Sequence, residues 1–405
     1  MKVLVSAFQC CPGWGSELAT GWAWATTLAE YGHDVTVLTS SDYRNHITAA
    51  GPQGADFRYI DFPASPLRKV APPLAVYDTY RRWQDDALAY IRPEAERYDV
   101  IHHVTWGGLH LGSQLWQLPV PMIYGPAGGG QTAPSRYWRY FGRDWPAEVA
   151  RTATTGPLLG LNRRCAETVK HATVTLVCNS ATGDAVRRLG ATDVRFMMAD
   201  GLAAEWLGEP RTSPPAGPPV VLWVGRMISR KSPVLAVEAF AELRKAMPAR
   251  LLMAGDGPLR GQVEAAIDRL GVRDDVDLPG RVPNDQLMPL YDSASALLFT
   301  SLRESFGAPF LEALGRGLPT VALDLHGIGD MEVGAAALKV ALPPEPRDLP
   351  ARVGAALHEI LSDGAWSDRS AAGVSWAADW IWPAKIAAAS EIYTEIAGRQ
   401  PASLS

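Results

Sequence analysis

The chain has few cysteines, no long apolar run and no excess of positive charge, and each absence excludes a class of protein. Four cysteines stand among its 405 residues without a CxxC pair, so we expect free thiols in a reduced setting and no disulfide framework. No apolar run approaches the roughly 18–20 residues that span a bilayer. The N-terminus reads as a strand and lacks the regions of a signal peptide, which predicts a cytoplasmic protein.

The overall charge is slightly acidic. The chain carries 38 basic and 43 acidic residues, a formal net charge of −5. No global positive field is available to hold nucleic acid, so we expect no nucleic-acid partner, and local cations must bind any anionic ligand. One residue type is abundant: there are 14 tryptophans, and no low-complexity segment accounts for them.

The first half has the order strand, helix, strand. An apolar run at 2–7 is followed by a turn rich in glycine and proline, by apolar residues at helical spacing over 17–31, and by a second apolar run at 34–39. This order is typical of a parallel sheet with helices on its faces. We expect further strands at 99–103, 122–124 and 174–178.

A proline-rich segment over 209–219 has no periodicity and predicts a linker. After it the same order restarts, with strands expected at 220–224, 250–254, 276–278, 296–299 and 320–323 and helices at 233–246, 259–270, 285–293 and 309–315. The simplest solution is an α/β protein with two Rossmann-like, doubly wound domains. Ligands of such sheets bind at the carboxyl ends of the strands, which predicts a cleft between the domains.

The tail carries a helical pattern over 375–398 that is broken at Pro383, where a kink can return the chain to the first domain. We expect Trp376 and Trp380 to hold this returning tail. The predicted domains are therefore residues 1–205 with 380–405, and residues 206–379.

Two cations follow the strand at 220–224. Arg226 and Lys231 leave its end five residues apart, on a short loop before a helix. The planar fork of arginine and the compact charge of lysine suit a pyrophosphate. Two solvated surface cations are the alternative.

Two glutamates flank the start of the helix expected at 309–315. Gly307 permits close backbone approach, and Pro309 suits a first helical turn whose free N–H groups face an anion. Glu304 lies in the loop, where it can accept hydrogen bonds from sugar hydroxyls. Glu312 lies about one turn inside the helix, within reach of a vicinal diol such as ribose. The alternative is an acid favoured by the helix dipole beside an exposed helical glutamate.

Four motifs follow one another in the second half: Gly225-Arg226 with Lys231, Gly255-Asp256-Gly257-Pro258, Gly280-Arg281-Val282-Pro283, and Glu304 with Glu312. In order and approximate spacing they resemble family four of the retaining, nucleotide-sugar-dependent glycosyltransferases, which have the GT-B fold. The resemblance covers nearly the whole second domain and is looser in the first, which in this family recognises the acceptor.

The resemblance implies a role for each motif. Arg226 and Lys231 would bind the donor diphosphate, Glu304 the hydroxyls of the transferred sugar, and Glu312 the ribose diol. Further donor contacts are implied at Gly255, Phe306, Gly307, Arg281 and Val282, the last two in the base-binding loop. The donor would be a nucleoside diphosphate sugar, UDP- or GDP-linked, and no other cofactor is expected.

In the first domain, Gly13-x-Gly15-Ser16-Glu17 resembles the family's glycine loop, which closes over diphosphate and acceptor, and Gly15 is the implied donor contact. The segment fails as a dinucleotide fingerprint. Leu18 occupies the third glycine position, and the second strand ends in Thr39-Ser40-Ser41 where an acid is required. A dehydrogenase is therefore not favoured.

Two histidines stand at the end of the strand at 99–103, a place that favours a site over a core. We expect His103 to be catalytic and His102 to contact substrate, with structural roles as the alternative. A histidine pair without a third ligand is weak evidence for a metal. Asp275-Val276-Asp277 matches the metal-binding DxD pattern but reads as a solvated turn, so no metal is expected.

Many family members carry a further histidine after the next strand, where this chain has three successive glycines. The resemblance thus implies a glycine-rich GPxGGG branch. We expect Gly128 and Gly129 to approach the substrate closely, and a flexible turn is the alternative. Trp14 and Trp106 stand at predicted ligand-facing loops, where sugar rings can stack on them, and are candidate acceptor contacts.

The segment 136–145 interleaves arginines with aromatic residues. A packed insertion, an acceptor-binding flap and a weak membrane-surface contact all remain open for it. It shows no long amphipathic period, and its basic count is too small for firm anchoring to anionic lipid.

The sequence favours a retaining glycosyltransferase that moves a sugar to a hydroxyl acceptor, a small natural product or a glycan or lipid-linked precursor. Because Glu304 has a binding role and no carboxylate is placed as nucleophile, we expect a metal-independent front-face mechanism. A nucleotide-sugar epimerase or hydrolase on the same scaffold and a non-catalytic nucleotide-sugar binder are the alternatives. The excess of arginine over lysine and the abundant alanine suggest a bacterium with a GC-rich genome.

Overall fold

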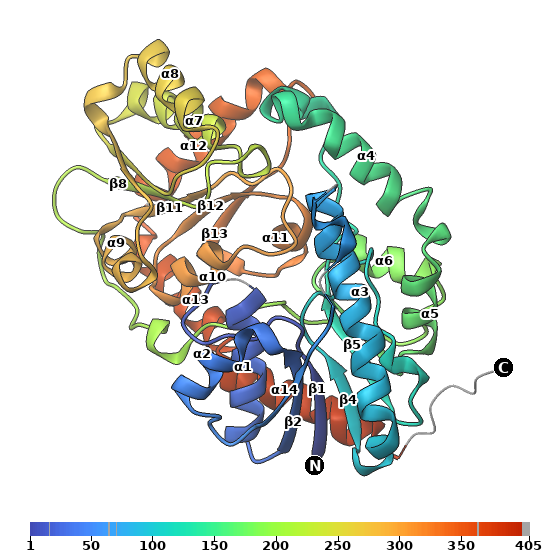
Figure 1. Ribbon diagram of the computed structural model, residues 1–405. Coiled ribbons are helices and arrows are strands. Elements are labelled where there is room, and N and C mark those ends of the chain that lie inside the picture. The colour runs from blue at the N-terminus through green and yellow to red at the C-terminus, as the bar shows by residue number, and fades with distance from the viewer. Residues whose placement is uncertain (16, 64, 70, 363, 399–405) are drawn as a thin grey trace. The chain divides into compact units, whose positions relative to one another are not determined.

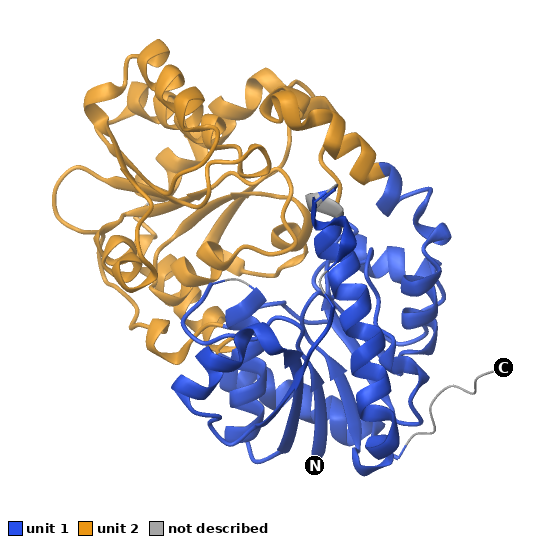
Figure 2. Cartoon of the chain, in the orientation of Figure 1, with its two compact units in different colours: residues 1–130, 153–201, 382–405 blue, residues 131–152, 202–381 orange. Residues whose placement is uncertain are grey.

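The computed structural model describes residues 1–15, 17–63, 65–69, 71–362 and 364–398. The chain divides into two compact units (Figure 2). Unit 1 comprises residues 1–130, 153–201 and 382–405, and unit 2 comprises residues 131–152 and 202–381. Each unit has a parallel sheet of its own (Figure 1).

The sheet of unit 1 has seven strands in the order β3-β2-β1-β4-β5-β6-β7, all paired in parallel. Its strands are β1 (Lys2–Ser6), β2 (Asp34–Ser40), β3 (Asp56–Ile60), β4 (Val100–His103), β5 (Met122–Ala127), β6 (Val174–Val177) and β7 (Val194–Phe196). Its helices are α1 (Glu17–Glu30), α2 (Arg44–Ala50), α3 (Pro72–Ile91), α5 (Arg163–His171), α6 (Ser180–Arg188) and α14 (Trp382–Ile396).

Both faces of this sheet are buried, because successive side chains of a strand point to opposite faces. In β1, Val3 and Val5 pack into a cluster with residues of α1, α2 and α14. Leu4, between them, packs into a second cluster with residues of α3, α5 and α6. Such two-sided burial explains why the strands read as continuous apolar runs without alternation.

The sheet of unit 2 has six strands in the order β10-β9-β8-β11-β12-β13, again all parallel. The strands are β8 (Val220–Val224), β9 (Arg250–Ala254), β10 (Val276–Gly280), β11 (Ala296–Phe299), β12 (Thr320–Leu323) and β13 (Ala337–Val340). Its helices are α7 (Pro233–Ala246), α8 (Arg260–Leu270), α9 (Leu287–Ser293), α10 (Ala308–Gly315), α11 (His326–Asp330), α12 (Leu349–Ser362) and α13 (Trp366–Ala378). A further helix, α4 (Trp145–Thr155), crosses from unit 2 into unit 1.

The predicted fold class is confirmed: both sheets are parallel, and every strand that the apolar runs predicted is present. The strands β3, β7 and β13 were not predicted from the sequence. All three lie at sheet edges and include half-buried positions, so they lack a continuous apolar run.

Residues 131–152 lie with unit 2, whereas the sequence analysis placed them in the first domain. The reason is packing. Tyr137 is buried and its hydroxyl donates to the carbonyl of Pro343 at 2.7 Å, and the hydroxyl of Tyr140 donates to Glu238 Oε2 at 2.7 Å. Phe141 joins the same core cluster. The segment 136–145 is therefore a packed insertion of unit 2.

The tail returns to unit 1 as α14, and a short break after α13 precedes Pro383 in the first turn of α14. Trp376 and Trp380 do not hold it, because both lie in unit 2, where Trp376 packs edge-on to Phe310 at 6.3 Å. Trp382 takes that role, edge-on to Trp24 at 5.8 Å. Residues 399–405 of the predicted tail lie outside the described residues.

Among the described residues, no helix combines the length and the apolar character that crossing a bilayer requires. In the same part of the chain, no three His, Cys, Asp or Glu side chains come together as metal ligands would. The acids of the DxD pattern are engaged elsewhere, Asp275 with Arg244 and Asp277 with Arg250.

Candidate functional site

The strand order of unit 2 reverses between β8 and β11, which are neighbours in the sheet. At such a switch point, connections to opposite faces leave a crevice at the carboxyl ends of the strands, where ligands of open α/β sheets bind. Arg226 and Lys231 lie on the loop that follows β8, and Glu304 and Gly307 lie on the loop that follows β11. The fold thus brings the two most informative motifs together.

The two loops are joined by charged side chains. Lys231 Nζ lies 2.5 Å from Glu304 Oε2, and Arg230 Nη1 donates to the same oxygen at 2.6 Å. The side chains of Lys231 and Glu304 are only 13% and 14% exposed. The backbone fixes the same junction, since the Leu302 N–H donates to the Arg230 carbonyl at 2.9 Å. Arg230 was not predicted, because an arginine beside a motif lysine gives no signal of its own.

The charge of Lys231 depends on its neighbours. Burial lowers the pKa of its ammonium group, Glu304 opposes this shift, and the nearby Arg230 and Arg226 lower the pKa further. Its Nζ also lies 5.2 Å from the centroid of the Phe299 ring, close enough for a cation–π contact. An anionic ligand here would stabilise the ammonium form, as Glu304 does in this structure.

Arg226 is exposed, and no ion pair to it is found within the described ranges. Its guanidinium is available to a ligand at the same edge of the sheet. Lys231 and Arg226 therefore differ: one cation is held by a carboxylate and the other is open.

Gly255 stands where two loops touch. Its φ is +150°, and a Cβ there would lie 1.8 Å from the carbonyl oxygen of Gly225. Its N–H donates to the Gly280 carbonyl at 2.8 Å. The loops after β8, β9 and β10 therefore form one surface, and Arg281 and Val282, which follow Gly280 directly, belong to it. Arg281 is exposed and Val282 half-buried.

Gly307 caps α10, and its lack of a side chain is required by packing. A Cβ at this position would lie 2.2 Å from Cζ of Phe299. The preceding Phe306 is buried. Pro309 is the second residue of α10, so the helix begins as predicted and its N-terminus carries the partial positive charge that favours an anion.

Glu312, in the second turn of α10, is positioned by a residue that the sequence analysis missed. The hydroxyl of Tyr291, a fully buried side chain of α9, donates to Glu312 Oε2 at 2.6 Å. Burial, together with the charge of Glu312, raises the pKa of Tyr291 well above its ordinary value, so the phenol stays protonated and keeps donating. A buried tyrosine in an ordinary helical pattern does not reveal such a role.

The segment 131–152 forms hydrogen bonds with the loop that carries Glu304. Arg303 donates to both carboxylate oxygens of Glu148, at 2.7 and 2.8 Å, and Gln131 Nε2 donates to Ser305 Oγ at 2.5 Å. His326, at a φ of +52°, also contacts this loop through a hydrogen bond with the backbone of Leu302. These contacts are tertiary, so no residue spacing in the sequence indicates them.

The two histidines of β4 are core residues, which corrects the expected catalytic and substrate roles. Both are fully buried. His102 contacts the Tyr393 hydroxyl at 2.6 Å and the Gly125 carbonyl at 2.8 Å, and His103 contacts the Tyr80 hydroxyl at 3.1 Å and Ser6 Oγ at 3.0 Å. Burial lowers the pKa of each ring to about 3. Both ring nitrogens of each histidine are engaged, and neither ring has exposed surface in this structure.

The glycine-rich loop after β5 packs against neighbouring segments of unit 1. Gly128 donates to the Gly107 carbonyl at 3.0 Å and accepts from the Leu109 N–H at 3.2 Å, so both of its backbone groups are engaged and the expected substrate contact is not supported. Gly129 is buried, with a φ of +112°. A Cβ at Gly130 would lie 2.5 Å from the Ala181 carbonyl oxygen, so the glycines serve close packing.

The switch point of unit 1 lies between β1 and β4, and the loops there carry the tryptophans that were expected to meet a ligand. Trp14 is 54% exposed, edge-on to His46 at 5.8 Å, and Gly15 beside it is exposed. Trp106 is half-buried, and its backbone N–H donates to Glu17 Oε2 at 3.2 Å. Trp106 also lines a cavity of about 650 Å³ at this edge of the sheet. Ser16 lies outside the described residues.

Residues 209–363 match the family model described as glycosyl transferases group 1, and residues 20–199 match the glycosyl transferase 4-like domain. The two halves of the chain are glycosyltransferase domains. The group 1 match includes all the motifs of unit 2, and the 4-like match includes the loops of Trp106 and the glycine run.

Curated relatives include the 2-deoxystreptamine glucosyltransferase of Streptomyces kanamyceticus, 36% identical over 118 residues, which are 29% of this chain and 30% of that protein. The D-inositol 3-phosphate glycosyltransferase of Frankia alni is 35% identical over 178 residues, 41% of this chain and 42% of that protein. The chain thus spans less than half the length of either relative.

Among solved structures, sucrose-phosphate synthase from Thermosynechococcus elongatus matches with a TM-score of 0.68 at 20% identity, covering 98% of this chain and 99% of that one. Anabaena HepE, solved in complex with UDP and glucose, matches with a TM-score of 0.62 at 16% identity, covering 97% of this chain and 99% of that one. Similarity at this level shows the fold, which is GT-B.

Proposed function

We propose that the chain is a retaining glycosyltransferase that moves a sugar from a nucleoside diphosphate sugar to a hydroxyl acceptor. The observation that carries the proposal is the junction at the switch point of unit 2, where Glu304 holds Lys231 and Arg226 stays open. A diphosphate would take the place of the Glu304 carboxylate on Lys231 and recruit Arg226. Glu304 would then be released to accept hydrogen bonds from hydroxyls of the transferred sugar.

The proposed chemistry is a front-face substitution. The bond between the anomeric carbon and the diphosphate oxygen breaks, and a bond from the acceptor oxygen to the same face of that carbon forms. The acceptor proton passes to the departing phosphate oxygen. Lys231, Arg226 and the N-terminus of α10 stabilise the charge that develops on the diphosphate, so the step requires no metal.

Neighbouring proteins support the choice of substrates. HepE has been solved with UDP and glucose, and the relative from Streptomyces is described as a 2-deoxystreptamine glucosyltransferase. We propose a UDP- or GDP-linked donor, with Glu312 on the ribose diol and the loop at Arg281 and Val282 beside the base. The proposed acceptor is a small natural product or a glycan or lipid-linked precursor, and the proposed setting is the bacterial cytoplasm, where four free, buried cysteines would stay reduced.

A donor screen followed by a turnover assay tests the proposal. Thermal unfolding is measured with a panel of UDP, GDP, ADP and dTDP sugars, of which the cognate donor should raise the midpoint most. Lys231→Ala should then lower turnover at saturating donor by about 10²–10³-fold. Lys245→Ala is the matched control, because Lys245 lies on the surface of α7 in a pair with Glu242. Near-full turnover by Lys231→Ala would overturn the diphosphate assignment.

The same assay separates the alternatives. An epimerase or hydrolase forms product from the donor alone, whereas a transferase needs an acceptor beyond slow transfer to water. A non-catalytic binder shows the thermal shift without turnover. Lys231 and Arg226 would bind the diphosphate in each of these cases, so the requirement for an acceptor is the result that distinguishes them.

A further inference from the structure

A cavity of about 650 Å³ lies at the carboxyl edge of the unit 1 sheet. Residues that follow four neighbouring strands line it: Phe8 after β1, Asp42 and Tyr43 after β2, Asp61 and Phe62 after β3, and Trp106 after β4. It therefore includes the β1–β4 switch point of this sheet, the place where open α/β sheets bind ligands. Its volume falls in the range of small-molecule sites, about 300–1,000 Å³.

One wall of the cavity is a fixed aromatic surface. The Trp106 ring stacks on Tyr80, with centroids 5.1 Å apart and planes inclined by 21°, and Phe8 meets it edge-on at 5.2 Å. The backbone of Trp106 is held at a φ of +58° while its N–H donates to Glu17. The indole face is thus positioned before any ligand arrives.

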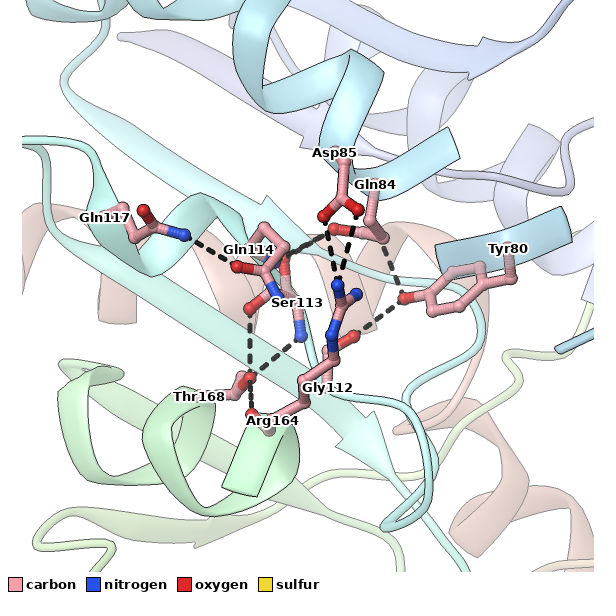
Figure 3. A network of polar contacts seen from close by, with 9 residues as sticks. All are labelled: Tyr80, Gln84, Asp85, Gly112, Ser113, Gln114, Gln117, Arg164 and Thr168. Carbon is pink, nitrogen blue, oxygen red and sulfur yellow. Dashed lines mark hydrogen bonds and ion pairs between the residues drawn. The ribbon is translucent and has the colours of Figure 1, made fainter. Parts of the chain in front are cut away.

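Tyr80 is itself held by a polar network (Figure 3). Its hydroxyl donates to the Gly112 carbonyl at 2.9 Å and accepts from Gln84 Nε2 at 3.0 Å. Gln84 in turn accepts from the Gln114 N–H at 3.0 Å through Oε1. The network ties α3 to the loop at 112–114, so the ring beneath Trp106 cannot turn away from it.

The charges of the lining are unbalanced. Asp42 and Asp61 are both exposed, and neither forms an ion pair with any residue that the structure describes. Arg68 is the single lining cation, likewise without an ion pair in the described part of the chain, so the lining carries two carboxylates against one guanidinium. A third carboxylate, that of Glu17, adjoins the cavity through its hydrogen bond to Trp106.

Aromatic faces beside unpaired carboxylates attract a cation. The negative face of an indole or phenyl ring favours an ammonium group, and a carboxylate adds charge-assisted hydrogen bonds. The flat face of a sugar or cyclitol ring can stack on the same indole. A neutral polyol would leave the two aspartates with the Arg68 guanidinium as their single counter-charge in the lining, and an anion would be repelled by them.

We propose that this cavity is the acceptor site and that it takes a cyclic polyol bearing at least one ammonium group. That the bound polyol is the acceptor rests on the proposed glycosyltransferase function, whereas binding of the polyol to the cavity can be measured without turnover. Trp106 supplies the stacking face, and Asp42 and Asp61 bind the ammonium and hydroxyl groups.

Titration calorimetry without donor tests the proposal with three probes: 2-deoxystreptamine, neutral scyllo-inositol and anionic inositol 1-phosphate. The diamino probe should bind at least about tenfold more tightly than the neutral one, a preference of the size expected for a charged pair that is partly desolvated. Raising the salt concentration should reduce this preference, because the carboxylates are exposed.

Variants assign the preference to residues. The double variant Asp42→Asn with Asp61→Asn should lose it, and Trp106→Ala should weaken binding of both cyclitols. Asp34→Asn is the matched control, since Asp34 is an exposed aspartate at the start of β2, the opposite edge of the same sheet. Arg68→Gln should keep or increase the preference. Thermal unfolding of each variant identifies any that fails to fold.

Equal binding of the amino and neutral probes, or tightest binding of the phosphate probe through Arg68, would overturn the proposal. Failure of this proposal can be distinguished from failure of the proposed function. If UDP still binds and the sugar is transferred to a hydroxyl acceptor of another class while no amino probe binds, the acceptor class is wrong and the transferase stands. If the amino probe binds but no nucleotide does, the transferase proposal fails and the cavity assignment stands.

Discussion

Glu304 Oε2 lies 2.5 Å from Lys231 Nζ. The two side chains come from the loops after β11 and β8, which are far apart in the sequence, yet they form one ion pair. Both belong to the motifs that resemble a nucleotide-sugar site. In this pair the Glu304 carboxylate occupies Lys231, the cation that we propose binds the donor diphosphate. In this structure Glu304 therefore neutralises Lys231, and the proposed donor diphosphate would have to displace the Glu304 carboxylate.

Replacing Glu304 by glutamine tests this exchange. Without the carboxylate, Lys231 and Arg230 face each other uncompensated, so the free energy of unfolding should fall by about 1–3 kcal/mol. Because UDP no longer competes with a carboxylate, we expect Glu304→Gln to bind UDP more tightly than the wild type, while sugar transfer is lost. Calorimetry with UDP and thermal unfolding with and without UDP measure both effects.

Glu242→Gln is the control for that variant, since Glu242 pairs with the exposed Lys245 on α7. Weaker binding of UDP to Glu304→Gln than to the wild type would show that Glu304 does not compete with the diphosphate.

Tyr291→Phe removes the hydrogen bond that positions Glu312 and leaves the buried ring in place. We expect the donor KM to rise about five- to tenfold, as for the loss of a typical hydrogen bond of about 1 kcal/mol, with little change in kcat. Steady-state kinetics with varied donor measures the split. Tyr31→Phe, at an exposed tyrosine of unit 1, should change neither constant. A fall in kcat alone would indicate that Glu312 acts on the reacting sugar and not on the ribose.

Gly255→Ala should disrupt the surface formed by the loops after β8, β9 and β10. The added Cβ would meet the Gly225 carbonyl oxygen, a backbone atom that cannot move aside cheaply. We expect a loss of about 1–3 kcal/mol in the free energy of unfolding. Gly261→Ala, on α8 with open space around it, is the matched control and should be neutral or stabilising. Urea unfolding of both variants decides the point.

The buried histidines should make the protein acid-sensitive. Their pKa of about 3 in the folded state lies below the ordinary value of 6.5, so the stability they contribute is complete above pH 6.5 and is lost as the pH falls toward 3. His103→Asn should make the slope of unfolding free energy against pH shallower by about 1.4 kcal/mol per pH unit below pH 6. Urea unfolding from pH 7 to pH 4.5 measures it.

The same variant tests the correction to the catalytic assignment. If His103 is structural, the folded fraction of His103→Asn keeps the kcat of the wild type and the same pH profile. A profile that loses an ionisation would restore a catalytic role to His103.

The sequence alone predicted the two parallel sheets, the loops that carry Arg226, Lys231 and Glu304, and the helix that carries Glu312. It did so because buried parallel strands are continuous apolar runs, and because the loop motifs directly follow those runs in the chain. Such local patterns depend on neighbouring residues in the chain, so tertiary packing does not alter what they predict.

The contacts that each polar side chain makes depend on the tertiary structure. His102 and His103 end a strand as site residues do, yet Tyr393, from the distant tail, and Tyr80 occupy their nitrogens. Conversely, Tyr291 and Arg230 gain their roles only because packing brings them to the two motif glutamates. A hydrogen-bond partner far along the chain leaves no periodicity or spacing to read, so the sequence could place the loops but not assign the side chains within them.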